Sequence, residues 1–455
     1  MEMILEFLRD VLSQPALLIG IMSCVGLIAL KRPFHKVMTG TLKPILGYLM
    51  LAAGAGVIVS NLDPLGKMIE HGFHITGVVP NNEAIVAVAQ KVLGVETMSI
   101  LVVGLLMNLC IARFTKFKYV FLTGHHSLFM ACLMSAVLGT AGLSGIELIL
   151  VGGFLMGAWS AISPAIGQSY TSKVTDGDEI ALGHFGSLGY YLSAWVAKYV
   201  GKAEESTEDI EIPEKWGFLR DSTLSTALTM IVFYLIAAIA AGSEFVATLS
   251  GSMSPYLFAI MSAMNFAVGV AIVYSGVRMI LGDLIPAFQG IATKIIPNAI
   301  PAVDCAVFFT YAPTAVVLGF ISSFIGGIIG MLILGVVGGV LIIPGLVPHF
   351  FCGATAGIYG NATGGRRGAA VGAFLNGLAI TFLPALALPV LGQLGFQNTT
   401  FGDADFAVMG LVLGNAFEWI GMAGIYGIVV IAALVLIVPN FIKTKGKVIN
   451  YVEED

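Results

Sequence analysis

The sequence predicts an all-α polytopic membrane protein, and three observations support this class. Hydrophobic residues make up 57% of the 455 residues, charged residues make up 11%, and the mean hydropathy is +0.94. Soluble domains carry roughly 25% charged residues. The apolar residues are gathered in runs of about 20, the length that a helix needs to cross a bilayer. The 56 glycines fit this class, because small residues let helices pack closely in lipid.

The apolar runs predict about eleven transmembrane helices and two re-entrant hairpins. The long runs lie near 12–31, 44–61, 97–113, 119–142, 146–168, 222–247, 254–280, 314–343, 366–392 and 417–440. Shorter or glycine-rich pieces near 178–200, 344–362 and 403–416 predict hairpin or surface segments. The most polar stretch, 202–221, is too short to bury a core of its own. We therefore expect residues 1–455 to form one membrane-embedded unit without a soluble domain.

The same polar stretch divides the chain into two halves of similar size. Each half has about five crossings and one interrupted segment with ionisable residues, which predicts two inverted repeats with a binding site at their interface. The repeats cover approximately 12–200 and 222–392, and a final helix follows at 417–440. Lysine and arginine gather in 31–43, 113–118 and the C-terminal tail. The positive-inside rule then predicts a cytoplasmic C-terminus and an N-terminus outside.

The stretch 295–313 places Asp304 within almost wholly apolar sequence, together with Pro297, Pro301 and Pro313. A carboxylate in lipid costs several kcal/mol unless it faces a protein interior or a watery cavity. Prolines this close together do not fit one straight spanning helix, because each removes a backbone donor. The stretch predicts a broken helix or re-entrant hairpin that brings Asp304 to a polar site at membrane depth. The alternative is a carboxylate satisfied by neighbouring backbone in a tight bundle.

Three further polar clusters interrupt apolar sequence. Residues 123–127 include His125 and His126, residues 183–187 include His184, and residues 81–83 include Asn82 and Glu83. Imidazoles at membrane depth usually bind a polar ligand or relay protons. A lone intramembrane histidine can instead hydrogen-bond a neighbouring helix. Clusters in both halves, together with the buried carboxylate, favour a binding site for a small polar molecule.

The sequence lacks the motifs that are typical of several other kinds of functional site. Two histidines and an aspartate could ligate zinc, but HExxH and metal-type spacing are absent. Neither the GxSxG motif of a nucleophile elbow nor the GxxxxGK[ST] motif of a phosphate-binding loop occurs. The five cysteines include no CxxC pair, which argues against a disulfide framework or metal cluster. We expect no cofactor, and the net charge of −5 implies no nucleic-acid partner.

Five strings resemble one known family, and they occur in the same order along nearly the whole chain. They are 122–125, 174–177 followed by Gly183 and His184, 201–209, 276–279 and 302–305. The family is the ascorbate-specific membrane component, enzyme IIC, of the bacterial phosphotransferase system. The resemblance implies a homodimer in the inner membrane, with eleven helices in each protomer. It also implies a core domain that binds L-ascorbate and moves as a rigid body, and a V-shaped dimerisation domain.

The resemblance further implies a transport subunit that is not itself the enzyme. Soluble A and B components would pass phosphate from phosphoenolpyruvate, and the phosphocysteine of the B component would make L-ascorbate 6-phosphate. The family's ligand-contacting positions match Asn82, Glu83, His125, His126, Ser127, Leu128, Phe129, His184, Phe185 and Asp304. One departure is that other members carry a glutamine after the first histidine, where this chain has 127–130. The alternatives are an ion-coupled secondary transporter and a phosphotransferase carrier for a polyol such as galactitol.

Overall fold

A computed structural model describes residues 11, 14–74, 77, 78, 80, 82–210, 222–392 and 400–441. Within these residues, seven helices are long and apolar enough to cross a membrane, or eight if one bent pair is a single span. The α-helices are α2 (Pro15–Ala29), α3 (Phe34–Phe73), α4 (Asn82–Phe114), α5 (Gly124–Thr140), α6 (Gly145–Thr175), α7 (Ser187–Val200), α8 (Ser222–Ala241), α9 (Ser243–Ser250), α10 (Pro255–Lys294), α11 (Pro313–Val336), α12 (Leu346–Gly392), α13 (Ala404–Ile420) and α14 (Met422–Phe441). The predicted class, an all-α polytopic membrane protein, is confirmed; the predicted count of eleven crossings stays a prediction.

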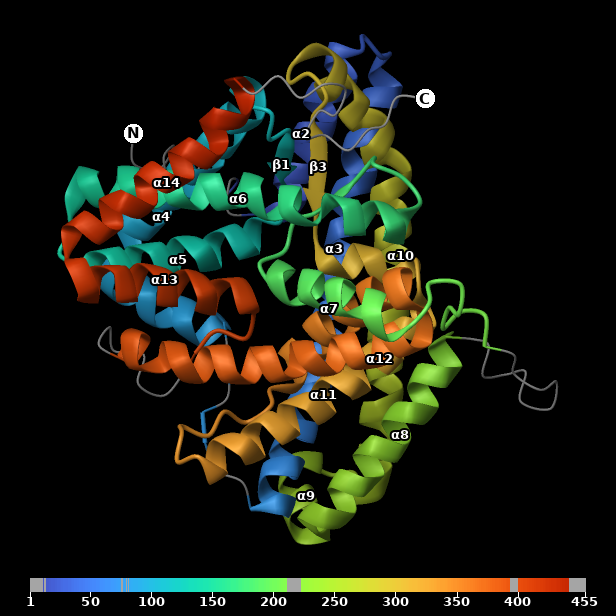
Figure 1. The fold of residues 1–455 in the computed structure, drawn as a ribbon. Helices are drawn as coiled ribbons and strands as arrows, with labels where there is room; N and C mark the ends of the chain where they lie inside the picture. The colour runs from blue at the N-terminus through green and yellow to red at the C-terminus, as the bar shows by residue number, and fades with distance from the viewer. Residues whose placement is uncertain are drawn as a thin grey trace.

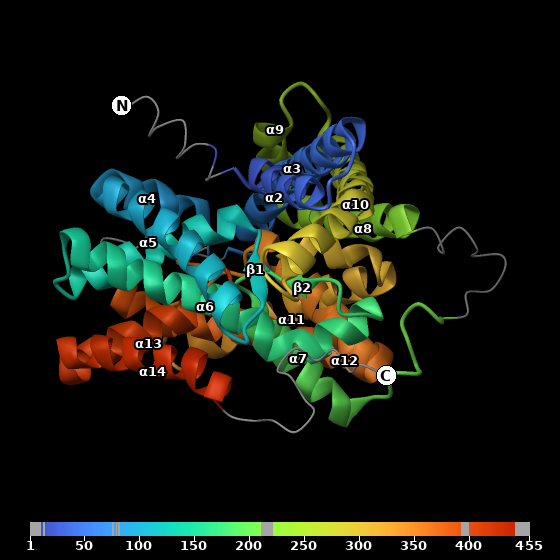
Figure 2. The same cartoon turned by 90° about the horizontal axis from the view of Figure 1, so that it is seen from above.

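The helices form three bundles that meet at the centre of the molecule. Figures 1 and 2 show α4, α5, α6, α13 and α14 in a first bundle and α2, α3, α8, α9 and α10 in a second. Helices α7, α11 and α12 form a third bundle between them, with α12 packed along both α7 and α11. The first bundle has its own apolar core, and a second core runs through the other two bundles.

A small parallel sheet lies where the bundles meet. Its strands are β1 (Tyr119–Phe121), β2 (Ala181–Leu182) and β3 (Ile300–Val303), in the order β1-β3-β2. Strands β1 and β2 lead into α5 and α7, and β3 leads into a short 3₁₀ helix, η2 (Cys305–Thr310). Because the strands are parallel, their carboxyl ends lie at the same edge of the sheet. This edge brings together the residues that follow each strand.

The interrupted segment predicted at 295–313 is confirmed. Strand β3 and helix η2 replace a spanning helix here, and Asp304 is the N-cap of η2. Helix α12 has a kink of its own at Gly364 and Gly365, between the predicted segments 344–362 and 366–392. Gly365 has φ +59°, and a Cβ on it would come within 2.3 Å of two backbone oxygens, those of Lys202 and Glu205. Only glycine fits there, because both the backbone angle and the space exclude a side chain.

Several predicted boundaries are wrong. Helix α3 covers 40 residues instead of 44–61, since it accommodates Pro44 and Pro64, so Lys36 and Lys43 lie on a helix and not in a loop. The run 119–142 opens with β1, and helix α5 starts only at Gly124. The predicted final helix at 417–440 is divided by Gly421, whose φ is +61°, between α13 and α14.

Two further segments differ from the prediction in secondary-structure type, and one predicted span is bent. The pieces 344–362 and 403–416, predicted as hairpin or surface segments, belong largely to helices α12 and α13. The predicted span 222–247 bends by 117° between α8 and α9. The three strands were not predicted, because two to four apolar residues in a row carry no recognisable strand period.

Close contact between α3 and α10 leads to a first prediction. A Cβ on Gly276 would lie 2.6 Å from the backbone oxygen of Gly47, whereas a Cβ on Gly282 meets nothing within 4 Å. We expect Gly276→Leu to lower the free energy of unfolding by about 1–3 kcal/mol or more, because the helix backbones would have to separate. The measurement is thermal unfolding of the purified protein in detergent. Gly282→Leu is the matched control, and equal losses from both substitutions would contradict the prediction.

Candidate functional site

A cavity of about 910 Å³ opens beside the carboxyl edge of the sheet. Small-molecule pockets are usually about 300–1,000 Å³. Most of its lining is apolar, and the polar groups near the sheet edge come from several elements. They are Tyr48, Asn82, His125, His126, His184, Asp304, Cys305, Cys352 and Asp403. The cavity therefore lies between elements that are far apart in the sequence.

The structure brings together most of the residues that the sequence predicted as a site. Asn82, His125, His126, Phe129, His184 and Asp304 all line the cavity. Three predicted residues are not among its described lining. Ser127 is buried, with its hydroxyl donating to the backbone oxygen of Thr123; Phe185 is buried and stacks on Phe121; and Leu128 packs against the apolar core of the first bundle. The side chain of Glu83 falls outside the described residues.

Asp304 is held by one hydrogen bond from the backbone and by a contact with His125. Its Oδ1 accepts the backbone N–H of Ala306 at 3.1 Å, and its Oδ2 lies 3.3 Å from Nε2 of His125. His125 Nδ1 lies 3.1 Å from the hydroxyl of Tyr48, which comes from α3. A buried carboxylate needs such partners, because burying an unpaired charge costs much free energy. Oδ1 therefore accepts a hydrogen bond from the local backbone, whereas Oδ2, which contacts His125, is available to the cavity.

His126 and His184 form a second polar group, and their rings lie 3.8 Å apart. The backbone N–H of Phe185 donates to Nδ1 of His126 at 3.3 Å, and that of Gly186 donates to Nδ1 of His184 at 3.1 Å. A ring nitrogen that accepts a hydrogen bond carries no hydrogen, so this network assigns the hydrogen of each neutral ring to Nε2. The cavity therefore has two adjacent N–H donors, which suit a ligand rich in acceptor atoms.

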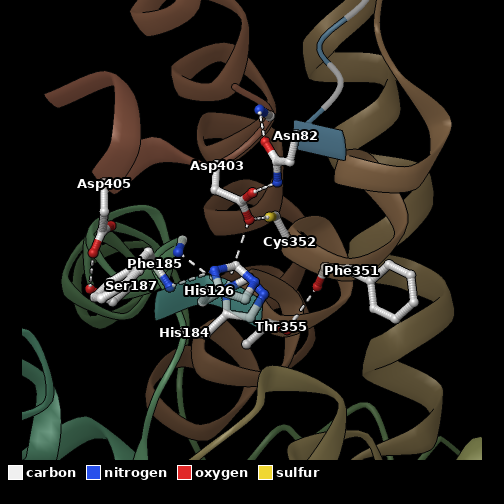
Figure 3. Close-up of polar contacts among 12 residues, drawn as sticks. Asn82, His126, His184, Phe185, Ser187, Phe351, Cys352, Thr355, Asp403 and Asp405 are labelled. Atoms are coloured by element: carbon white, nitrogen blue, oxygen red, sulfur yellow. Dashed lines mark hydrogen bonds and ion pairs between the residues drawn. The ribbon is translucent and has the colours of Figure 1, made fainter. Parts of the chain in front are cut away.

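Asp403 is a site residue that sequence reasoning missed. The residue is 5% exposed, and Figure 3 shows it beside Asn82, Cys352 and the two histidines. Asn82 Nδ2 donates to its Oδ2 at 2.6 Å, and Cys352 Sγ donates to its Oδ1 at 2.9 Å. The same Oδ1 lies 3.8 Å from Nδ1 of His184. The sequence feature that could have identified Asp403 is a pair of aspartates, Asp403 and Asp405, at the start of an apolar run.

Asp405 stabilises the elements that carry the site. Its carboxylate is fully buried and accepts from the Ser187 hydroxyl at 2.7 Å, the Leu188 N–H at 2.9 Å and the Trp159 indole N–H at 3.1 Å. Two of these donors are in the first turn of α7, where a carboxylate also interacts favourably with the helix dipole. Asp405 therefore holds α7, and the loop that carries His184, against the first bundle.

Two side-chain groups have the residue types of a metal site. They are His126, His184 and Asp403, and His184, Asp304 and Cys305, with ligand atoms within 4.8 Å of one another in each group. The hydrogen bonds do not favour a metal, however. A cation on Nε2 would displace the hydrogen of a ring whose Nδ1 already accepts a backbone N–H. The arrangement therefore fits a hydrogen-bonded organic ligand better than a metal ion.

The sequence of the chain is similar to that of known proteins. The family described as "PTS system sugar-specific permease component", EIIC-GAT, matches residues 10–405. One relative is the "Ascorbate-specific PTS system EIIC component" of Mycoplasma pneumoniae (strain ATCC 29342 / M129 / Subtype 1), which is 27% identical over 420 residues. That similarity covers 78% of this chain and 62% of the relative, so the chain spans less than two thirds of the relative's length. The family match includes every residue that lines the sheet-edge site, and the chain belongs to the family of PTS sugar-specific permease components.

Proposed function

We propose that the chain carries L-ascorbate across the bacterial cytoplasmic membrane, coupled to its phosphorylation to L-ascorbate 6-phosphate by partner A and B components. The observation that carries this proposal is the pair of Nε2–H donors on His126 and His184, on the same cavity as the carboxylate of Asp304. Ascorbate is a small anion with an acidic enediol and several hydroxyl groups. The relative's name supports the choice of ascorbate among sugar-like substrates.

The two kinds of polar group suit different parts of this substrate. Imidazole N–H groups can donate to the enediolate oxygens, and an ionised carboxylate can only accept, so Asp304 is suited to the hydroxyls. His125 is paired with Asp304 and orients that carboxylate. Phe129 adds an apolar surface to the cavity. Glu83, Ser127, Leu128 and Phe185 stay predicted contacts. Asn82 was predicted as a contact too, but both ends of its amide are hydrogen-bonded to other residues.

Phosphate transfer in this proposal belongs to the partner proteins, and this chain is the permease. The test is uptake of labelled L-ascorbate into cells that contain the A and B components, with analysis of the product. We expect L-ascorbate 6-phosphate, and no uptake without the partners. Free substrate accumulated by vesicles containing this chain alone under a pH gradient would instead identify an ion-coupled secondary transporter. Stronger competition by galactitol than by unlabelled ascorbate would identify a polyol carrier.

The proposal includes the arrangement of the chain in the membrane. We propose a homodimer in which the second bundle contributes to the V-shaped dimerisation domain and the other two bundles form the core. The two inverted repeats, 12–200 and 222–392, the N-terminus outside and the C-terminus in the cytoplasm belong to the same proposal. Labelling of single cysteines introduced near each terminus, in intact and permeabilised cells, tests the orientation. The mass of the purified protein, corrected for detergent, tests the dimer.

Replacement of His184 separates its structural contact from its proposed contact with the substrate. Asn in place of His184 puts an amide oxygen near the position of Nδ1, so the Gly186 N–H keeps an acceptor while the cavity loses the Nε2–H donor. We expect ascorbate affinity to fall about 10- to 100-fold, because a hydrogen bond to a charged group is lost, with little change in thermal stability. Equilibrium binding by calorimetry measures the effect.

His349 offers a matched control for that experiment. It is buried outside the cavity lining, and its Nδ1 lies 2.9 Å from the Ser323 hydroxyl. His349→Asn should leave ascorbate affinity unchanged, even if it lowers stability. Wild-type affinity in the His184→Asn protein would show that the His184 donor does not hold the substrate.

A further inference from the structure

We propose that Asn82 and Asp403 form a clamp that positions the part of the cavity wall made by the starts of α4, α12 and α13. In this assignment Asp403 is a positioning residue for substrate binding, and Asn82 acts through the same clamp and not as a direct ligand. The inference rests on the proposed function, since it concerns the same cavity. It is carried by the hydrogen bonds that these two side chains make with each other and with their neighbours.

Both ends of the Asn82 amide are engaged in hydrogen bonds within the protein. Its Nδ2 donates to Asp403 Oδ2 at 2.6 Å, and its Oδ1 accepts the backbone N–H of Gly402 at 2.9 Å. The side chain thus bonds to two consecutive residues ahead of α13. Asn82 is also the first residue of α4, so the clamp joins the start of α4 to the start of α13. These segments are 320 residues apart in sequence.

The second oxygen of Asp403 extends the clamp to α12. Cys352 Sγ, in the first turns of that helix, donates to Oδ1 at 2.9 Å. The segments at the starts of α4, α12 and α13 are also closely packed, which supports this connection. A Cβ on Gly402 would lie 2.5 Å from the ring of Pro348, and a Cβ on Gly345 would lie 3.3 Å from the backbone oxygen of Pro80. Pro80, Gly345 and Pro348 line the cavity together with Asn82 and Asp403.

The clamp has consequences for His184. Asp403 Oδ1 lies 3.8 Å from Nδ1 of His184, too far for a hydrogen bond. That nitrogen accepts from the Gly186 N–H and lies 2.9 Å from the Tyr190 hydroxyl. The carboxylate therefore sets the position of the wall relative to the imidazole without sharing a hydrogen with it. A displaced wall would change the space available to a substrate held by His184.

An exchange of the two side chains tests the clamp. Asp403→Asn alone places an amide against the amide of Asn82, and Asn82→Asp alone places two carboxylates together. The double variant restores the pair in reverse. The amide N–H at position 403 can donate to the carboxylate at position 82, and this carboxylate can still accept the Gly402 N–H. The amide oxygen at position 403 can still accept from Cys352. The clamp returns with its donor and acceptor exchanged.

We expect each single variant to bind ascorbate about 10- to 100-fold more weakly than wild type, and the double variant to recover most of that loss. Calorimetric binding to purified protein is the readout, with thermal unfolding as the measure of folding. Asp209→Asn is the matched control, because Asp209 is exposed in the loop after α7. Cys352→Ala removes the donor to Asp403 and should bind ascorbate more weakly than Cys352→Ser, which keeps a donor at this position.

The outcomes separate this inference from the function on which it rests. If the wild-type protein does not bind ascorbate, the proposed substrate is wrong. If wild type binds and the double variant stays as weak as Asp403→Asn, the carboxylate at position 403 acts through its own contact and the clamp assignment is overturned. Normal binding by both single variants would overturn the clamp as well. If a single variant does not fold, recovery of both folding and affinity in the double variant still supports the clamp.

Discussion

Asp304→Asn should reduce ascorbate binding and uptake about 100-fold while leaving the protein folded. The amide oxygen of an asparagine can still accept the Ala306 N–H as N-cap of η2, so the local backbone keeps its partner. The other half of the amide carries hydrogens and faces Nε2 of His125, which removes the carboxylate's contact with His125 and the acceptor for substrate hydroxyls. Loss of the carboxylate's charge-assisted hydrogen bonds to the substrate accounts for an effect of this size. Binding calorimetry and cellular uptake measure it.

The control for this substitution is again Asp209→Asn, which changes the formal charge equally at an exposed position. A folded Asp304→Asn protein with lost binding supports the assigned role. An Asp304→Asn protein that fails to fold in detergent would instead support the alternative in which this carboxylate serves only the neighbouring backbone. Unchanged binding in a folded variant would remove Asp304 from the site.

A covalent link between α2 and η2 should stop transport. We expect the segments near 122–130, 178–200, 295–313 and 344–362 to move together as a core, while those near 12–31, 44–61 and 222–247 stay with the dimer partner. Ile19 of α2 and Val307 of η2 line the same small cavity of about 10 Å³, so cysteines at these positions face a common space that a short crosslinker can bridge. The link would join the two proposed bodies. Radiolabelled uptake before and after crosslinking, and after cleavage of the linker, measures the effect.

A link inside the proposed core is the matched control. Strands β2 and β3 hold 178–200 and 295–313 side by side, and Glu179 and Tyr311 are both exposed, so cysteines at these two positions can be joined by a crosslinker that links the two segments. The background needs Cys352→Ser, which keeps a donor to Asp403, and replacement of the other native cysteines. We expect uptake to survive this second link. If it abolished uptake with binding retained, the two segments would not belong to one rigid body.

The amino-acid sequence by itself determined the membrane class and the interruption of the helix pattern at Asp304. Apolar runs of membrane-spanning length predict helices because lipid leaves the backbone no other partner. A carboxylate among prolines in such sequence predicts a break at a polar site, and 295–313 has that break. The histidine clusters were found by the same reasoning, since a polar side chain is costly in lipid wherever it occurs. His125, His126, His184 and Asp304 all line one cavity.

Only the tertiary structure decided how those residues meet and which further groups hold them. Strand pairing between 119–121, 181–182 and 300–303 depends on partners far away in the chain, and such short runs carry no local period. The roles of Asp403 and Asn82 depend on a hydrogen bond between residues 321 positions apart. The hydrogen positions on His126 and His184 likewise follow from backbone N–H groups that only the folded chain places beside them. Local composition determines where a polar group is costly, whereas the partner that compensates this cost is chosen by three-dimensional packing.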